Sequence, residues 1–209
     1  MNIGVLNIGT GSLSSIKTKI ITLGHEFVEI SSPSELASVN RLILPGVGSF
    51  EYAANNINYF FSDNLLNQYL SDSQNKILGI CLGMQILFNR SDESSTLCKG
   101  LSLLNANIQR ITSSPPARIP HIGWSSINIQ QEGTFLSKSM NGADFYFVHS
   151  YALLNSESNR HLFDEYSLSS NGNCSFISSF RFRNLYGCQF HPEKSSLAGS
   201  AFLLKFIES

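Results

Sequence analysis

Three short apolar runs, each followed by a segment of helical periodicity, constrain the first half of this chain. The runs are IGVLNI (3–8), RLILP (41–45) and ILGIC (77–81). Helices are expected over about 12–23, over about 50–70, and from about residue 83. Strands that read as continuous runs of Val, Ile and Leu are buried on both faces, and crossover helices imply parallel pairing. We therefore predict an α/β fold with a doubly wound, mostly parallel sheet flanked by helices.

After Gly100 the pattern changes to short strands separated by turns. Strand-like segments are LSLLNANIQRI, SSINIQQ, DFYFVHSYA, CSFISSFRF and YGCQFH, with turns at Glu132-Gly133 and Asn184. The amphipathic stretch SSLAGSAFLLKFIE predicts a last helix. This half is expected to form an antiparallel C-terminal extension of the sheet. Because the linker-like segment SSPPAR (113–118) is too short for a domain boundary, residues 1–209 are expected to form one domain.

Composition argues against several classes of partner. Lys and Arg total 14 and Asp and Glu total 15, and a net charge of -1 provides no field for binding nucleic acid or an anionic membrane. No apolar run approaches the roughly 20 residues of a membrane span, and MNIGVLNIGTGS lacks the features of a signal peptide. We expect a cytoplasmic protein. Its cysteines are then expected to be thiols rather than disulfides, at positions Cys81, Cys98, Cys174 and Cys188.

The strongest chemical signal is Gly79-Ile80-Cys81-Leu82-Gly83, where a buried strand gives way to a helix. This setting matches the G-x-S-x-G nucleophile elbow, with sulfur in place of oxygen. The two glycines permit a sharp turn that exposes the central side chain, and the following helix N-terminus favours its thiolate form. The alternative is a small buried core cysteine. The glycines and the strand-to-helix context favour a nucleophile.

A thiolate that cleaves an amide needs a histidine within hydrogen-bond reach, because the leaving nitrogen must be protonated. His191 follows the apolar strand YGCQF and precedes Pro192 and Glu193. This spacing places His191 and Glu193 on the same side of an extended segment, where the carboxylate can orient the imidazole. Alone, His-Pro-Glu is ordinary turn composition. Together with the elbow, it is better explained as the acid–base part of the site.

The segment Leu44-Pro45-Gly46-Val47-Gly48 also follows a buried strand. In an open parallel sheet, ligands bind beyond the carboxyl ends of the strands, so this loop and the elbow are expected to face one crevice. Its backbone can present an N–H group to a developing oxyanion, together with the N–H of Leu82. Without Cys81, the same segment would be a plain strand-to-helix turn.

Two other motifs are incomplete. Gly9-Thr10-Gly11 begins like a dinucleotide fingerprint, but Ser14 stands where the third glycine is required. There is no H-E-x-x-H motif, and the cysteines are too far apart in sequence for a zinc knuckle. We therefore expect no cofactor and no metal. Trp124, within RIPHIGWSS, fits a core position and an interface anchor equally well.

The segments GICLGMQ (79–85) and QFHPEKS (189–195) resemble the class I, triad-type glutamine amidotransferases. Within that family, LPGVGSF (44–50), PHIGW (120–124) and YFVHSY (146–151) are similar to the glutaminase subunits of imidazole glycerol phosphate synthases, which serve histidine biosynthesis. The resemblance covers residues 3 to about 207. It departs from the family pattern at NIGTGS (7–12), where D-Y-G-x-G-N is common, and at Ser125, where Asn is common.

By motif position, the resemblance implies a catalytic triad of Cys81, His191 and Glu193 that forms a glutamyl thioester. The implied oxyanion hole consists of Leu82, Val47 and Gly48. The residues implied to bind the substrate glutamine are Gly46, Gln85, His149, Ser150 and Tyr151. Those implied to contact a partner are Pro120, His121, Gly123, Trp124 and Lys194. The implied partner is a barrel-shaped synthase (cyclase) subunit, which forms a heterodimer and uses the ammonia to make imidazole glycerol phosphate and AICAR.

Three alternatives remain open from the sequence. The chain resembles glutaminases that supply ammonia for amination or amidation of a surface-polysaccharide sugar. It is also compatible with an inactive scaffold subunit of the synthase. A cysteine hydrolase of γ-glutamyl peptides would need no partner, and the PHIGW and PGVG segments argue against it.

Overall fold

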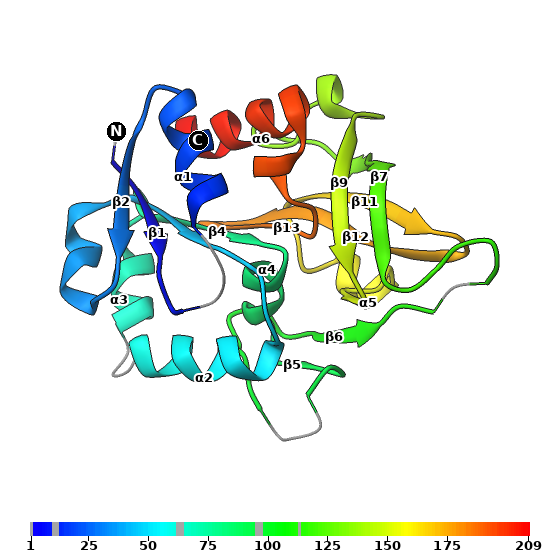
Figure 1. Cartoon of the computed structure of the whole chain (residues 1–209), viewed down its shortest axis with the longest axis horizontal. Coiled ribbons are helices and arrows are strands. Elements are labelled where there is room, and N and C mark those ends of the chain that lie inside the picture. Colours follow the sequence, from blue (N-terminus) through cyan, green and yellow to red (C-terminus); the bar gives the residue numbers. More distant parts are fainter. Residues whose placement is uncertain (1, 10–12, 62–64, 95–97, 113) are drawn as a thin grey trace.

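One eight-stranded sheet runs through the computed structural model, which describes residues 2–9, 13–61, 65–94, 98–112 and 114–209 (Figure 1). In spatial order the strands are β2 (Glu26–Ile30), β1 (Asn2–Leu6), β3 (Arg41–Leu44), β4 (Lys76–Ile80), β13 (Leu185–Cys188), β12 (Cys174–Phe182), β11 (Glu165–Asn171) and β8 (Asn128–Gln131). The first five pair in parallel and the last three continue antiparallel. The predicted fold class is confirmed.

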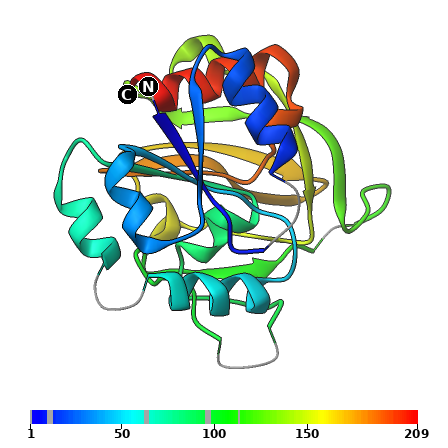
Figure 2. The ribbon, with the colours of Figure 1, turned by 60° about the vertical axis from the view of Figure 1, so that its left-hand side comes forward.

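Helices cover both faces of the parallel part (Figures 1 and 2). On one face lie α1 (Ser14–Thr22) and α6 (Ser196–Glu208), and on the other lie α2 (Phe50–Phe60), α3 (Leu65–Ser71) and α4 (Leu82–Ile86). Alternate residues of β3 point to opposite faces of the sheet. Ile43 packs with α1 and α6, whereas Leu42 and Leu44 pack with α2 and α3. No helix in the described ranges is both long and apolar enough to cross a bilayer.

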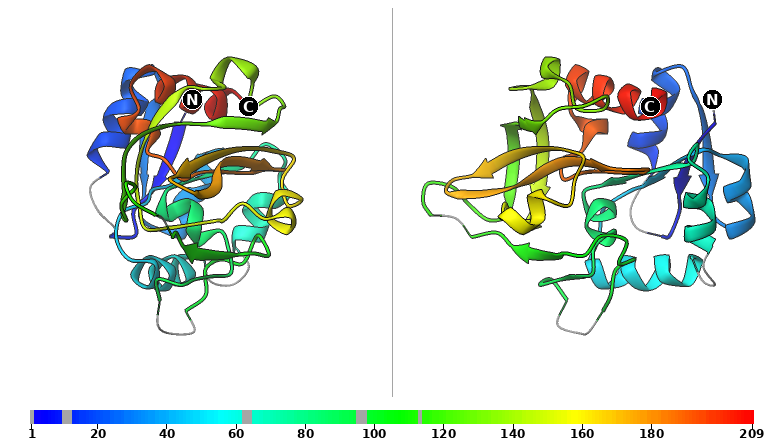
Figure 3. Two further views of the ribbon diagram at one scale, coloured as in Figure 1. Left: turned by 90° about the vertical axis from the view of Figure 1, so that its right-hand side faces the viewer. Right: turned by 180° about the vertical axis from the view of Figure 1, so that it is seen from behind.

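Smaller elements complete the described part of the fold. A two-stranded antiparallel ribbon, β7 (His121–Ser126) and β9 (Asp144–His149), is seen from two further sides in Figure 3. A third sheet joins β10 (Tyr151–Ala152), β6 (Asn107–Arg110) and β5 (Arg90–Ser91), and α5 spans Glu157–Arg160. Short 3-10 helices span Pro33–Ser38, Lys138–Met140 and Pro192–Lys194. The backbone N–H of His191 donates to the Tyr146 carbonyl, which attaches the ribbon to the carboxyl end of β13.

The elements differ from the sequence-based expectation in a few places. Strand β2 was not predicted because Glu26 and Glu29 interrupt its apolar pattern, and β11 was not predicted because its buried positions include Ser167 and Ser169. The expected strand over 101–111 is reduced to β6, and the expected helix over 50–70 is divided into α2 and α3. The first helix begins at Ser14, and the expected start at Ser12 lies outside the described residues.

The carboxyl ends of β3 and β4 touch through backbone alone. A Cβ atom on Gly83 would overlap the carbonyl oxygen of Leu44, and one on Gly46 would overlap the backbone of Ile80 and Leu82. Atoms of the backbone cannot move aside as the tip of a flexible side chain can. The loop after β3 and the turn after β4 therefore hold their relative positions only while both residues are glycine.

We expect Gly83→Ala to destabilise the fold by at least about 3 kcal/mol, the upper range for overpacking a tight core. Urea unfolding followed by circular dichroism measures this free energy. The matched control is Gly24→Ala, because nothing lies within 4 Å of a Cβ there and only the φ of +84° is unfavourable. That strain costs about 1–2 kcal/mol. Equal losses in the two variants would contradict the backbone contact.

Candidate active site

Cys81 occupies the sharp turn between β4 and α4. Its backbone has φ 51° and ψ -107°, an uncommon conformation for a residue with a side chain. Strain of this kind costs about 1–3 kcal/mol and persists where surrounding contacts enforce it. Here the N–H of Cys81 donates to the Cys188 carbonyl at 2.7 Å, and the Cys81 carbonyl accepts from the N–H of Gln85 at 3.1 Å. The turn directs the sulfur into a pocket, as an elbow predicts.

His191 and Glu193 form a hydrogen-bonded pair close to Cys81. The distance from His191 Nδ1 to Glu193 Oε1 is 2.8 Å, and both side chains are largely buried. The expected extended segment ends at His191, because residues 192–194 form a 3-10 helix that begins with proline. This turn brings Glu193 back onto the imidazole, and Ser195 Oγ stabilises it by donating to the His191 carbonyl at 2.6 Å.

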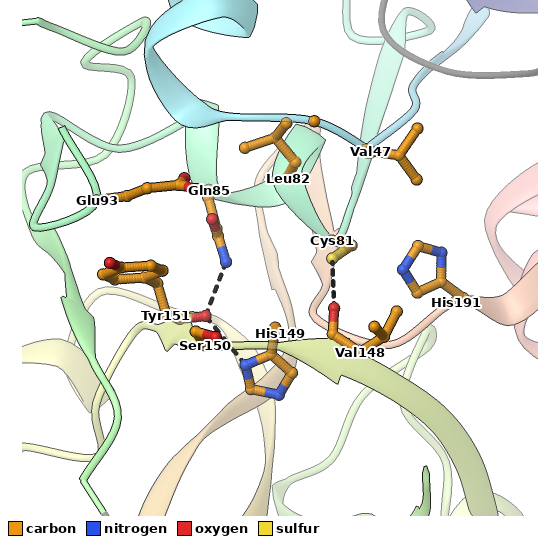
Figure 4. A pocket seen from close by; sticks show the side chains of 12 residues that line it. Val47, Cys81, Leu82, Gln85, Glu93, Val148, His149, Ser150, Tyr151 and His191 are labelled. Carbon is orange, nitrogen blue, oxygen red and sulfur yellow. Dashed lines mark hydrogen bonds between the residues drawn. The ribbon is translucent and has the colours of Figure 1, made fainter. Parts of the chain in front are cut away.

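The charge of His191 depends on these two neighbours. Burial disfavours the imidazolium, but interaction with Cys81 and the hydrogen bond to Glu193 outweigh burial and raise the pKa of His191 to about 10. The other ring nitrogen, Nε2, has no hydrogen-bond partner among the described residues, and the ring lies beside Cys81 (Figure 4). A protonated imidazole is therefore present next to the sulfur at neutral pH.

A pocket of about 230 Å³ opens over the sulfur (Figure 4). Its walls come from the loop after β3, the elbow, the end of β9 and His191. It is lined by Gly46, Val47, Gly48, Cys81, Leu82, Gln85, Glu93, Val148, His149, Ser150, Tyr151 and His191. The structure thus brings together around one cavity the residues expected for an oxyanion hole and for substrate binding. Glu193 stands behind His191 and lines a neighbouring cavity with Lys194.

Three residues that contact the sulfur or line the pocket were not predicted from the sequence. Gln189 is fully buried and donates from Nε2 to Cys81 Sγ at 3.5 Å. The carbonyl of Val148 lies 3.9 Å from the same sulfur. Glu93 lines the pocket and accepts the N–H of Phe50 at 2.9 Å. Gln189 belongs to the QFHPEKS segment and could have been found there, whereas Glu93 in SDESS has the composition of a loop.

Amide hydrogen bonds fix Gln85. Its Nε2 donates to the Tyr151 carbonyl at 2.8 Å and to Gln189 Oε1 at 3.1 Å. Both amide hydrogens are used in these two bonds, so the oxygen is the atom left for a ligand. Gln85 therefore joins the helix after the nucleophile to the wall formed by Tyr151.

The pKa of His149 is shifted in the opposite direction to that of His191. Burial, followed by the proximity of His121, lowers the pKa of His149 to about 3, although a hydrogen bond to the Tyr151 carbonyl opposes the shift. Burial also lowers the pKa of His121. Burial therefore keeps both imidazoles neutral at physiological pH.

The residues expected at a partner interface divide into two groups. Trp124 is 53% exposed and packs edge-on against Tyr146, and Pro120 and Lys194 are also exposed. Gly123 is partly buried. The side chain of His121 is only 6% exposed and points into the molecule, where the Phe147 ring stacks on it. His121 is therefore not placed for direct side-chain contact with another protein.

The two incomplete motifs are only partly described by the structure. Gly9 is described, but Thr10, Gly11 and Ser12 lie outside the described residues. Within the described ranges, no group of three or more His, Cys, Asp or Glu side chains is arranged to hold a metal ion.

We expect Glu193→Gln to lower the pKa of His191, because it removes the charge that stabilises the imidazolium. NMR titration of the imidazole ring measures the pKa in both proteins. Since the folded pKa of about 10 exceeds the ordinary histidine value of 6.5, protonated His191 stabilises the fold fully below pH 6.5. This contribution is lost as the pH rises towards 10. An unchanged pKa in the variant would show that Glu193 does not hold the charge.

Comparison with known proteins shows the family of this chain. The family model described as glutamine amidotransferase class-I matches residues 8–208. The chain is 38% identical over 99% of its length to the imidazole glycerol phosphate synthase subunit HisH of Synechococcus sp. (strain CC9902), of which it covers 94%. It is 35% identical over 97% of its length to the chloroplastic imidazole glycerol phosphate synthase hisHF of Arabidopsis thaliana, of which it covers 33%.

The fold has solved counterparts. The structure of PurLQS from Thermotoga maritima includes a chain that superposes with a TM-score of 0.72 at 14% identity, covering 99% of this chain and 97% of that one. At that identity the likeness concerns the fold. The family match over nearly all residues, together with relatives above 30% identity, establishes that this chain belongs to the class-I glutamine amidotransferases.

Proposed function

We propose that this chain is the glutamine-hydrolysing subunit of an imidazole glycerol phosphate synthase, with Cys81, His191 and Glu193 as its catalytic triad. The observation that carries the assignment of residues is the strained Cys81 turn beside the His191–Glu193 pair, with 2.8 Å between imidazole and carboxylate. The full-length similarity to synthase subunits supports the choice of pathway.

The pocket suits the side chain and backbone charges of glutamine. Glu93 supplies a carboxylate for the α-ammonium group, and Gln85 offers its free amide oxygen as an acceptor. The segment from His149 to Tyr151 forms the opposite wall, where backbone N–H groups can receive the α-carboxylate. The carboxamide carbon then meets the sulfur of Cys81.

Hydrolysis proceeds in two steps. The Cys81 sulfur attacks the carboxamide carbon, and backbone N–H groups of Leu82 and of the Val47–Gly48 segment hold the resulting oxyanion. The C–N bond breaks as the His191 imidazolium gives its proton to the leaving nitrogen, which departs as ammonia. A water molecule, deprotonated by the now neutral His191, cleaves the glutamyl thioester and releases glutamate. Glu193 stabilises the imidazolium in each step.

We expect Cys81→Ala to reduce glutamine hydrolysis at least about 10⁴-fold, as loss of a catalytic nucleophile does. Glutamate release measured by a coupled assay gives the rate. A diazo ketone analogue of glutamine should label Cys81, detected by mass spectrometry of the digested protein. Cys174→Ala is the matched control, because this partly exposed cysteine is not among the residues that line the pocket. Retained hydrolysis by Cys81→Ala would exclude the triad.

We further propose a heterodimer with a barrel-shaped cyclase subunit. Free ammonia is mostly protonated in neutral water and then cannot act as a nucleophile, so the consuming site must receive it directly. The exposed side chains of Trp124 and Ile122 stand on β7, and Lys194 follows the catalytic pair. These residues lie next to the pocket, because Trp124 packs on Tyr146 and the Tyr146 carbonyl accepts the N–H of His191.

The segment Gly46-Val47-Gly48 can act as a gate that controls glutamine hydrolysis. Val47 is exposed at the pocket rim, and Gly48 has φ +119°, which glycine tolerates readily. A peptide flip in this segment can complete or dismantle the oxyanion hole at little cost. Docking of the liganded partner then selects the complete form. The isolated chain should consequently be a weak glutaminase.

The cyclase subunit, with its own ligand bound, is expected to stimulate glutamine hydrolysis by about 100-fold, near the upper end of the usual range of coupling between sites. Trp124→Ala should weaken partner binding by about 2 kcal/mol, the loss typical of an interface anchor. Calorimetry measures the affinity, and basal hydrolysis should stay unchanged. Tyr59→Ala on α2 is the control, because Tyr59 is also exposed but lies outside this face. Full activity without the partner would contradict the gate.

The similarity to synthase subunits favours this proposal over the alternatives. The relatives named above are imidazole glycerol phosphate synthase proteins, which supports the histidine pathway rather than a surface-sugar pathway. The paired His191 and Glu193 beside Cys81 favour an active enzyme over a scaffold.

A further inference from the structure

A line of buried polar contacts runs from the exposed strand β7 towards the pocket. Ser125 Oγ lies 3.0 Å from His121 Nε2, and His121 Nδ1 lies 3.2 Å from His149 Nε2. His149 Nδ1 lies 3.0 Å from the Tyr151 carbonyl oxygen. His121 and His149 are directly opposite each other in the β7–β9 ribbon, so strand pairing itself aligns the rings.

The donor and acceptor roles along this chain of hydrogen bonds can be assigned from its inner end. A carbonyl oxygen only accepts, so the hydrogen of neutral His149 is on Nδ1 and its Nε2 must accept. His121 therefore donates from Nδ1, and its own Nε2 accepts the hydroxyl hydrogen of Ser125. Each group in the chain serves as donor to the next, from Ser125 to the Tyr151 carbonyl.

The surroundings leave little opportunity for water to replace these contacts. Both imidazoles are 6% exposed. The Phe147 ring stacks on His121 at 5.0 Å, and the Phe176 ring packs edge-on against His149 at 4.9 Å. A break in the chain would leave a buried ring nitrogen without a partner, which is unfavourable in an apolar environment.

The inner end of the chain reaches the nucleophile. The Tyr151 carbonyl also accepts from Gln85 Nε2, Gln85 donates to Gln189, and Gln189 donates to Cys81 Sγ. Figure 4 shows His149 and Gln85 meeting at the same carbonyl oxygen. The position of this oxygen is thus set from two sides, by the histidine chain and by the amides that contact the sulfur.

We propose that His121, His149 and Ser125 are positioning residues for glutamine hydrolysis. They hold the Tyr151 carbonyl, and through it the amides of Gln85 and Gln189, in place relative to the Cys81 sulfur. This rests on the proposed function, because it concerns the same nucleophile. These contacts connect β7, the strand that carries the exposed Trp124, to the Cys81 sulfur through the Tyr151 carbonyl and the two glutamine amides. Buried His121 then acts through its neighbours.

Reaction of Cys81 with a diazo ketone analogue of glutamine tests the proposal in the isolated chain. His121→Phe keeps an aromatic ring on Phe147 but removes the donor to His149. We expect the maximal labelling rate to fall about threefold to tenfold, the worth of one hydrogen bond, while the concentration for half-maximal labelling changes less. Ser125→Ala should act in the same direction, and Ser125→Thr, which keeps the hydroxyl, should restore the wild-type rate.

Ser126→Ala is the matched control, because Ser126 is the next residue of β7 and its side chain is exposed. NMR of the ring nitrogens provides an independent readout, and it should show His121 and His149 both carrying hydrogen on Nδ1. Labelling unchanged in His121→Phe, or either ring found protonated on Nε2 at neutral pH, would overturn the positioning role. Absence of labelling in the wild-type chain would instead contradict the proposed function, and the NMR result would then decide the histidine chain separately.

Discussion

The contact between two backbone segments, without any side chain between them, is the constraint on which this structure depends. Gly46 and Gly83 let the carboxyl ends of β3 and β4 approach until each backbone occupies the space where the other would carry a Cβ. This contact puts the Val47–Gly48 segment next to the turn that holds Cys81. In this turn Cys81 adopts the unusual φ of 51°, and its side chain lines the pocket. Strain at the nucleophile is therefore balanced by packing in the sheet behind it.

Two buried histidines that line the pocket differ in charge because their partners differ. His191 faces Glu193 and Cys81, which outweigh burial and keep the imidazole protonated. His149 is bonded to a carbonyl and to another neutral imidazole, so burial prevails. One site thus contains a protonated imidazole and a neutral one, and the difference arises from Cys81 and Glu193, which interact with His191. A cation at His149 would repel the imidazolium that protonates the leaving nitrogen.

Much of the fold followed from local pattern. The three apolar runs predicted parallel strands because residues buried on both faces must be apolar in succession. Strands β2 and β11 were missed because their partly polar sequences are compatible with strand only when neighbours complete the pairing. The reach of Glu193 back to His191 was expected on an extended segment, whereas Pro192 begins a helical turn that achieves the same contact.

By itself, the sequence determined the parallel core, the glycine-flanked Cys81 and the His191-Pro-Glu193 segment, since each is specified by residues adjacent in the chain. Only the tertiary structure decided which distant residues share the pocket. Glu93, Gln189 and Val148 come from three separate parts of the chain. Glu93 lines the pocket and the other two contact the sulfur, and these positions depend on strand order and register. It also decided that Trp124 is exposed while His121, three residues earlier, is buried, because the ribbon turns one face to solvent and the other to the aromatic core. Burial and long-range pairing are properties of the packed chain, and no short segment encodes them alone.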